Sequence, residues 1–222
     1  QGLRMSEAYR LYYSPGACSL APHIVLEELG VPYEPVRVLV NEGEGRRPEY
    51  LAVNPRGRVP ALLIRDAQGE RILTEAMAIM VYLTQTHGEP GALLPTSGEA
   101  FARAIEWMSW LGSTMHQSGV RTVFRPAYFT AQPDQSEAIA AQGRINVRAG
   151  YEDIEARLSG KPWALGSSFS VIDAYLLVFY RWGTRCGLSM RSGFPEYTRV
   201  MDAVRQRDAV QRIIGREGVE FE

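Results

Sequence analysis

The chain has 222 residues, a formal net charge of −1 and 22% charged residues. This even balance argues against nucleic acid as the main partner, and no segment approaches the ~20 consecutive apolar residues of a membrane-spanning helix. The two cysteines, Cys18 and Cys186, are too few and too far apart for a disulfide framework. They are typical of a reducing compartment, so we expect a cytoplasmic protein.

The first third of the chain alternates between predicted strands and helices. The strands are expected at residues 9–13, 33–40, 59–64 and 70–73, and the helices at about 19–29 and 74–86. A strand–helix–strand start implies a parallel strand pair, and the turn at residues 66–69 adds an antiparallel hairpin. The sequence therefore predicts an α/β domain over residues 9–86.

A segment rich in proline and glycine, residues 87–98, marks the predicted boundary between two domains. Beyond it, apolar residues recur at helical spacing and strand patterns are nearly absent. The helices are expected at residues 99–120, 134–158, 170–186 and 194–214. We therefore predict that residues 94–222 form an all-helical C-terminal domain.

Cys18 stands in the sequence YYSPGACSLAPH, between a predicted strand and a predicted helix. Pro22 is tolerated only in the first turn of a helix, so the helix begins near Cys18, with Ser19 as the expected N-cap. The amides and the positive dipole end of this helix would lower the pKa of Cys18 and favour its thiolate. Alternatively, Cys18 is only a small buried residue that closes the turn.

Other groups at this turn limit the chemistry. No second cysteine stands at CxxC spacing, which excludes an intramolecular dithiol cycle but leaves exchange with a small external thiol open. Tyr13 and Ser14 end the strand at the same edge and could donate to a bound sulfur. Alternatively, Tyr13 only packs within the strand and Ser14 only forms the turn. Among candidates for the catalytic group, Ser14 ranks second to Cys18.

Two further motifs could hold a small ligand. In NPRGRVPAL, Pro60 stands where a strand should begin, so the Val59–Pro60 bond is a candidate for cis geometry, and the Val59 backbone could pair with an extended peptide. In TEAMAI, the amides near Glu75 and Ala76 could hold a carboxylate at a helix start, and Glu75 could receive an ammonium group. Thr74 and Glu75 are expected to cap this helix in either case.

His116 lies in a predicted helix with small residues on its own face. Counted back at helical spacing, these neighbours are Ser113, Gly112, Ser109 and Ile105. Three of them are small, which would leave a hollow beside the imidazole. A cleft-lining histidine and a structural one are equally good interpretations.

Three other features are interpreted as structural. Ser170 and Asp173 match a capping box at the start of a helix. His23, inside the first helix, and His87, in the boundary segment, receive no functional role. No cluster of residues suggests a metal site.

The motifs together resemble the soluble glutathione transferases. The stretch YYSPGACSLAPHIVLEELG is similar to the signature of the bacterial beta class, which places a cysteine beside the glutathione sulfur. The resemblance continues through the segments AVNPRGRVPAL, LTEAMAI, IEWMSWLGSTMH and FSVIDAYLL. It implies a thioredoxin-like N-terminal domain, an all-α C-terminal domain, and a homodimer that acts in detoxification.

The resemblance also implies a site and a reaction. Glutathione would be the co-substrate, and a hydrophobic electrophile would be its partner. Cys18 would lie at the glutathione thiol and His116 would face it from the helical domain. The expected glutathione-binding residues are Val59, Pro60, Glu75, Ala76 and Ser109. The electrophile would lie near Trp110, Met115 and Phe124, for which core packing is an equally good interpretation.

Two other functions stay open. In the first, Cys18 forms a mixed disulfide with glutathione, and the protein is a thiol–disulfide exchanger. In the second, the protein binds a ligand or partner without catalysis. The second is favoured by departures from beta-class sequences. Those sequences often have lysine at the position of Gln117 and in the loop at residues 41–45, and asparagine at the position of Ser109.

Overall fold

The computed structural model describes residues 8–221, which form two compact units. The first unit contains the described residues up to Ala92 together with Arg205–Phe221, and the second is Leu93–Val204. The sequence predicts instead that residues 94–222 form one domain throughout. The last helix joins the first unit because it packs against the first helix of the chain. Within the described residues, no helix is long and apolar enough to cross a membrane.

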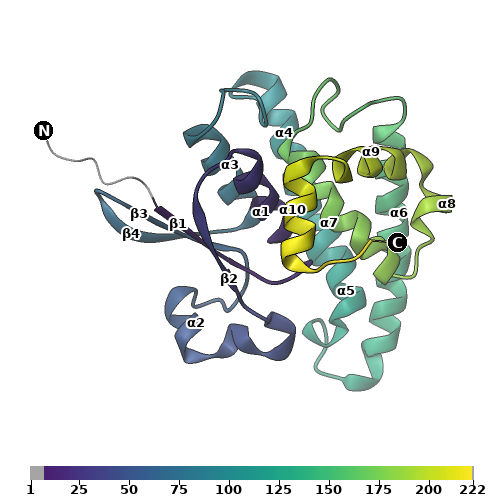
Figure 1. Ribbon diagram of the computed structural model, residues 1–222. Coiled ribbons are helices and arrows are strands. Elements are labelled where there is room, and N and C mark those ends of the chain that lie inside the picture. Colours follow the sequence, from purple (N-terminus) through teal and green to yellow (C-terminus); the bar gives the residue numbers. More distant parts are fainter. Residues whose placement is uncertain (1–7, 222) are drawn as a thin grey trace, which may run out of the picture. The chain divides into compact units, whose positions relative to one another are not determined.

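A four-stranded mixed sheet is the centre of the first unit (Figure 1). The strands are β1 (Ala8–Tyr13), β2 (Tyr33–Arg37), β3 (Ala61–Asp66) and β4 (Gly69–Thr74), in the order β2-β1-β3-β4. As predicted, β1 and β2 are parallel, and β3 and β4 form an antiparallel hairpin. At the hairpin turn, Gly69 has a φ of 105°, which glycine adopts without strain.

Two predicted strands have different bounds in the structure: β2 is shorter than expected, and β3 is shifted along the chain. β2 ends at Arg37, and the chain continues into the 3₁₀ turns η1 (Val40–Glu42) and η2 (Glu44–Arg46). β3 begins at Ala61 rather than at residue 59. Proline cannot donate to a strand ladder, which explains why Pro60 lies just before the strand.

The helices of the first unit come from several parts of the chain. They are α1 (Leu20–Glu28), α2 (Pro48–Val53), α3 (Ala76–Thr86) and α10 (Asp208–Glu217). α1 contacts both α3 and α10. The loop around Gly45 passes so close to Gly57 that a Cβ at either position would collide with the backbone of the other. This contact fixes the segment that leads to Val59.

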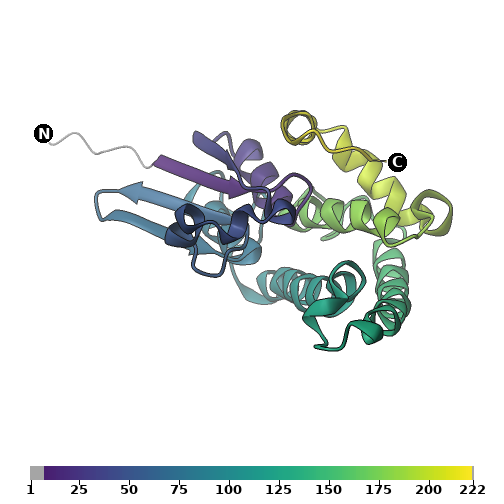
Figure 2. The same cartoon turned by 90° about the horizontal axis from the view of Figure 1, so that it is seen from below.

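The second unit is helical, as predicted. Its helices are α4 (Gly98–Trp110), the π-helix η3 (Leu111–Val120), α5 (Arg121–Phe124), α6 (Ser136–Leu158), α7 (Val171–Arg185), α8 (Met190–Gly193) and α9 (Pro195–Arg205), with short 3₁₀ turns η4 (Pro126–Tyr128) and η5 (Pro133–Gln135). Figure 2 shows α6 beside the continuous helical segment that η3 and α5 form. Gly150 of α6 lies so close to Met115 of η3 that a side chain there would collide with the sulfur.

The predicted capping box at the start of α7 is confirmed. The Ser170 hydroxyl accepts from the amide of Ile172 at 3.2 Å, and the Asp173 carboxylate accepts from the amide of Ser170 at 2.8 Å. The other carboxylate oxygen of Asp173 accepts from the amide of Ala164 at 2.8 Å. Burial raises the pKa of Asp173 to about 6, although these hydrogen bonds act in the opposite direction.

Candidate functional site

The turn that carries Cys18 joins the end of β1 to the start of α1. The Ala17 amide donates to the Ser14 carbonyl at 3.0 Å, and Gly16 has a φ of 65°. α1 begins at Leu20, so Pro22 is its third residue and costs no backbone hydrogen bond. Cys18 therefore lies at the strand-to-helix turn where the sequence predicts it, and its side chain is half-buried.

Ser19 does not act as the expected side-chain cap of α1. It precedes the helix, but its hydroxyl makes no capping hydrogen bond. Instead, the hydroxyl accepts from the Ser14 amide at 3.1 Å and donates to the Ser14 carbonyl at 3.2 Å. Ser19 already has a helical φ of −61°, whereas a capping side chain needs an extended backbone. Its hydroxyl therefore holds the turn, and Ser14 with it.

The Cys18 thiol is not poised as a thiolate, which corrects the sequence expectation. Burial raises the pKa of Cys18 to about 12, and the negative charge of Glu75 adds to this. The backbone amides of Cys18 and Ser19 lower the pKa, but by less than burial raises it. The sulfur donates a hydrogen bond to the Val59 carbonyl at 3.5 Å. At neutral pH, Cys18 is therefore a thiol and a hydrogen-bond donor.

The segment that reaches Cys18 from the other side contains the predicted cis bond. The Val59–Pro60 peptide is cis. The carbonyl of the preceding Arg58 accepts from the Tyr50 hydroxyl at 2.6 Å and from the Asn54 side chain at 2.8 Å. Val59 is half-buried and lies two residues before β3 begins. Its backbone is thus held beside the Cys18 sulfur but outside the strand ladder.

Glu75 has a backbone conformation that side chains rarely adopt. It lies between β4 and α3 with a φ of 72° and a ψ of 123°, and no other described non-glycine residue has a positive φ. Strain of this kind is concentrated at functional sites. The sequence expectation that Thr74 and Glu75 cap α3 is wrong. Glu75 makes no side-chain capping bond, and the Thr74 hydroxyl accepts instead from Arg56 at 3.0 Å.

These residues form a candidate site within the first unit. The Cys18 sulfur donates to the Val59 carbonyl, and the charge of Glu75 raises the pKa of Cys18. Ala76 is buried at the first turn of α3, where backbone amides point out of the helix. The arrangement offers a thiol donor, a backbone segment outside the strand ladder, and a helix start whose amides can bind an anion. Ser14 is buried beside them.

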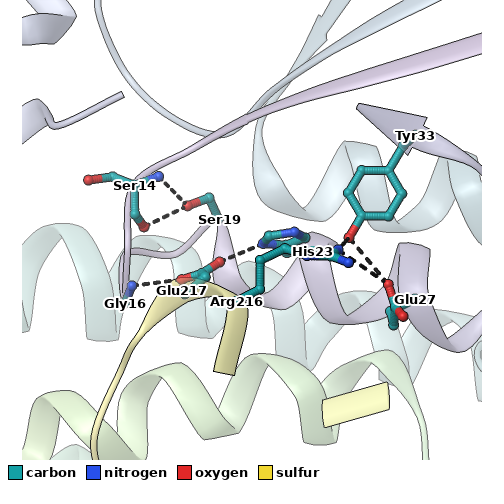
Figure 3. A network of polar contacts seen from close by, with 8 residues as sticks. All are labelled: Ser14, Gly16, Ser19, His23, Glu27, Tyr33, Arg216 and Glu217. Atoms are coloured by element: carbon teal, nitrogen blue, oxygen red, sulfur yellow. Dashed lines mark hydrogen bonds and ion pairs between the residues drawn. The ribbon is translucent and has the colours of Figure 1, made fainter. Parts of the chain in front are cut away.

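A buried pair behind the Cys18 turn was missed by the sequence analysis (Figure 3). The Glu217 carboxylate accepts from the Gly16 amide at 2.8 Å, and its other oxygen lies 2.6 Å from Nδ1 of His23. Both side chains are fully buried. Because a carboxylate only accepts, Nδ1 carries the proton. No sequence pattern joins two residues so distant in the chain, and His23 alone resembles an ordinary helix histidine.

Charged pairs hold α10, which carries Glu217, against α1. Arg207 contacts Glu28 through two hydrogen bonds of 2.6 and 2.9 Å, and Arg212 contacts Glu27 at 2.7 Å. Arg216 reaches Glu27 and Tyr33 (Figure 3). α10 is thus held against α1 along its length, and Glu217, its last residue, reaches the turn that carries Cys18.

His116 and Ser109 belong to the second unit. His116 lies in the π-helical segment, where the Arg121 amide donates to the His116 carbonyl. The α-helical count that predicts a hollow beside His116 therefore does not apply, because π-helical bonding shifts each residue around the axis. The imidazole packs on Trp182 with ring centroids 4.7 Å apart. Ser109 is exposed near the end of α4, and its carbonyl accepts from Ser113 at 2.8 Å.

The three residues expected near an electrophile have different surroundings. Met115 is buried and belongs to the core. Trp110 packs against Trp107, with ring centroids 6.1 Å apart. Phe124 is half-buried at the end of α5. Among residues 8–221, no group of histidine, cysteine or acidic side chains could hold a metal ion.

Comparison with known proteins places these features in a family. The family described as "Glutathione S-transferase, N-terminal domain" matches residues 7–85, and "Glutathione S-transferase, C-terminal domain" matches residues 112–208. Glutathione S-transferase GstA of Escherichia coli O157:H7 is 32% identical over 95% of this chain and 99% of its own length.

Solved structures agree with this placement. A glutathione transferase homologue from Sulfitobacter, with bound glutathione, has a TM-score of 0.86 at 32% identity and covers 96% of this chain and 99% of its own. A bacterial beta class glutathione S-transferase from Sphingomonas chungbukensis has a TM-score of 0.79 at 33% identity. That alignment covers 95% of this chain and 100% of the other.

Proposed function

This chain belongs to the glutathione S-transferase family, and on that premise we propose that it joins the sulfur of glutathione to a hydrophobic electrophile, with Cys18 beside that sulfur. Glutathione is the co-substrate. The observation that carries the proposal is the contact between the Cys18 sulfur and the Val59 carbonyl, at 3.5 Å, next to the cis bond to Pro60. We further propose a cytoplasmic homodimer.

Each part of glutathione has a matching group in the first unit. The cysteinyl backbone would pair with Val59, which lies outside the ladder of β3. The carboxylate of the γ-glutamyl end would accept from the amides near Glu75 and Ala76 at the start of α3. The ammonium group of that end would meet the exposed carboxylate of Glu75. The strain at Glu75 supports a binding role, because such strain persists where function requires it.

The high pKa of Cys18 determines its role in this reaction. A thiol that stays protonated cannot be the attacking group, but it can donate its proton in a hydrogen bond. We propose that Cys18 turns its S–H from the Val59 carbonyl toward the glutathione sulfur and stabilises the thiolate there. The proton of the glutathione thiol passes to the solvent. The thiolate then forms a bond to the electrophile, and the leaving group departs with its electron pair.

His116, Ser14 and Ser109 have supporting roles in the proposal. His116, in the π-helical segment of the second unit, is proposed as a second catalytic residue that acts on the thiol. Ser14 would hold the position of the turn through its contacts with Ser19. Ser109 would contact glutathione through its exposed hydroxyl.

Replacement of Cys18 separates the proposal from its alternatives. Conjugation of glutathione to an activated aryl chloride should survive in Cys18→Ala with a loss of about tenfold, the effect of one hydrogen bond to a charged sulfur. If the unmodified protein instead catalyses disulfide exchange, and that exchange vanishes in Cys18→Ala, exchange through a mixed disulfide at Cys18 is favoured. The buried Cys186 provides the control variant Cys186→Ala.

Calorimetric titration with glutathione tests the remaining alternative. Binding at millimolar glutathione or below, together with conjugation, is expected. Binding without turnover of either reaction would support a non-catalytic protein on the same fold. No heat at millimolar glutathione would contradict both enzymatic functions.

A further inference from the structure

A cavity of about 530 Å³ lies within the second unit alone. Its walls are formed by α4, by α6 and by the segment that follows α6. The side chains that line it include Glu106 and Trp107 of α4, Asp153 and Arg157 of α6, and Lys161. A cavity of this size can hold a small organic molecule. Charged groups therefore surround a space that the proposed transferase reaction does not use.

The guanidinium of Arg157 is held in place on one wall of this cavity. It lies 3.3 Å from the centre of a Trp107 ring and 5.6 Å from the centre of a Trp110 ring. Trp107 is buried, and burial lowers the pKa of Arg157, although arginine stays charged at neutral pH. The stacked contact with the indole orients the guanidinium before any ligand binds.

The N–H groups of Arg157 are not used by the protein. Its ion-pair partner Asp153 lies 3.7 Å away, which is longer than a hydrogen bond, and no other residue among 8–221 accepts one from the guanidinium. Arg103, at the same cavity, differs because it donates to Glu106 at 3.1 Å and to Glu99 at 3.3 Å. The cavity thus has one arginine whose donors are occupied and one whose donors are available to a ligand.

A second cation lines the same cavity. Lys161 is exposed, and among the described residues its ammonium group forms no ion pair. Its backbone is fixed, since its amide donates to the Leu158 carbonyl at 3.0 Å and its carbonyl accepts from Arg199 at 2.7 Å. Arg157 and Lys161 thus present two positive charges, while Asp153 beside Arg157 supplies one exposed negative charge.

The segment that follows α6 is anchored to α7. Ala164 lines the cavity, is buried, and donates its amide to the Asp173 carboxylate at 2.8 Å. Trp163 and Gly166, on either side of it in the chain, form an antiparallel bridge. Asp173 is held in turn by the capping box of α7. The cavity is therefore formed before a ligand binds, which lowers the entropic cost of binding.

We propose that this cavity binds a small hydroxylated molecule that carries a phosphate group. The phosphate oxygens would accept paired hydrogen bonds from the guanidinium of Arg157 and a further one from the ammonium group of Lys161. The hydroxyl groups would donate to the carboxylates of Glu106 and Asp153. The inference is independent of the proposed function, because all of these residues lie in the second unit and none takes part in the conjugation.

The charges favour a phosphate over a carboxylate at this position. A phosphate ester carries close to two negative charges at neutral pH, which matches the two cations. The pair of Asp153 with Arg157 is long and open to water, so it is weak enough for a doubly charged group to displace it. A polar ligand is favoured over an apolar one because Arg157 covers the indole of Trp107.

Three sugars that share one ring test the inference. Glucose 6-phosphate, glucuronate and glucose carry a phosphate, a carboxylate and no charge, respectively. Each is titrated into the full-length protein by calorimetry at two temperatures, so that a binding enthalpy near zero at one temperature does not conceal binding. We expect glucose 6-phosphate to bind about tenfold more tightly than glucuronate, and glucose not to bind.

Variants locate the bound phosphate. Arg157→Gln should weaken binding of glucose 6-phosphate by about tenfold, and Lys161→Gln by about threefold. Asp153→Asn should strengthen it by about threefold, because the competing negative charge is removed. Arg191→Gln should leave it unchanged, since that exposed arginine pairs with Asp202 at 3.1 Å and does not line the cavity.

Each other outcome has a defined meaning. Absence of binding by glucose 6-phosphate at both temperatures would overturn the inference, and so would equal affinities for glucose 6-phosphate and glucuronate. Unchanged affinity in both Arg157→Gln and Lys161→Gln would show that the phosphate binds elsewhere. If Arg157→Gln does not fold, Asp153→Asn decides the question, because damage to the protein does not produce tighter binding. Unchanged or weaker binding in Asp153→Asn would then overturn the inference.

Discussion

Glu217, near the end of the chain, places a carboxylate oxygen 2.6 Å from Nδ1 of His23 in the first helix, and both side chains are fully buried. The other carboxylate oxygen accepts from the Gly16 amide, in the turn that carries Cys18. The position of this turn therefore depends on the C-terminal helix. This relationship makes the end of the chain part of the support of the candidate site.

Replacement of Glu217 should destabilise the protein. In Glu217→Gln the side chain keeps its size, but its amide group cannot accept both from Gly16 and from His23. We expect the free energy of unfolding to fall by about 3 kcal/mol, because one donor stays buried without an acceptor. Denaturant unfolding measures this change. The exposed Glu89→Gln is the control, and an equal loss in both variants would contradict the assigned role of Glu217.

The pKa of Cys18 predicts an unreactive thiol. With a pKa of about 12, the thiolate fraction at pH 7.5 is at least about a hundredfold lower than that of an ordinary cysteine. We expect correspondingly slow alkylation by iodoacetamide, followed by mass spectrometry in a Cys186→Ala background. Alkylation at the rate of a small-molecule thiol would show that Cys18 carries a thiolate after all.

Glu75 should contribute to this low reactivity. Its negative charge raises the pKa of Cys18, so Glu75→Gln should lower that pKa and speed the alkylation of Cys18 by several-fold. The change preserves the size of the side chain. The exposed Glu70→Gln, in strand β4, is a control whose charge is not among the causes of the Cys18 shift. Equal rates in both variants would argue against electrostatic coupling between Glu75 and Cys18.

Glycine at position 75 should separate stability from binding. The φ of 72° and ψ of 123° strain any side chain, so Glu75→Gly should raise the free energy of unfolding by about 1 kcal/mol. The same change removes the carboxylate that is proposed to bind the ammonium group of glutathione. Glutathione affinity should therefore fall, measured by calorimetry, while thermal stability rises. A variant that loses stability would show that the backbone at Glu75 is relaxed.

Asp173 should make stability depend on pH in the acid range. Its folded-state pKa of about 6 lies above the unfolded value of 3.8, so the folded protein binds more protons between these two values. The contribution of Asp173 to the free energy of unfolding is therefore greatest below about pH 4 and falls as the pH rises to about 6. Relative to Asp173→Asn, the unmodified protein should lose up to about 3 kcal/mol over this range. A pH-independent difference in urea unfolding would contradict the raised pKa.

Local patterns in the sequence were enough to predict much of the fold and part of the candidate site. Pro22 limits where α1 can start, and Pro60 limits where β3 can start, because proline acts through its own ring and missing N–H. The capping box of Ser170 and Asp173 was also predictable from a local pattern, because its two partners are only three residues apart. The helical spacing after residue 98 predicted a helical second unit.

Other properties arise from contacts that no local pattern describes. Counting at α-helical spacing failed around His116, because the backbone there is π-helical and bonds one residue further along. Ser19 was expected to cap α1, but its hydroxyl is used within the turn. The strain at Glu75 follows from how β4 meets α3, which the residue type does not reveal.

By itself, the sequence determined that a cysteine stands at a strand-to-helix turn, and it made the Val59–Pro60 bond a candidate for cis geometry. Only the tertiary structure decided the charge of that cysteine and which segment supports it. The pKa of Cys18 is raised by desolvation, which depends on everything packed around the sulfur. The support comes from Glu217, because folding brings the last helix against the first.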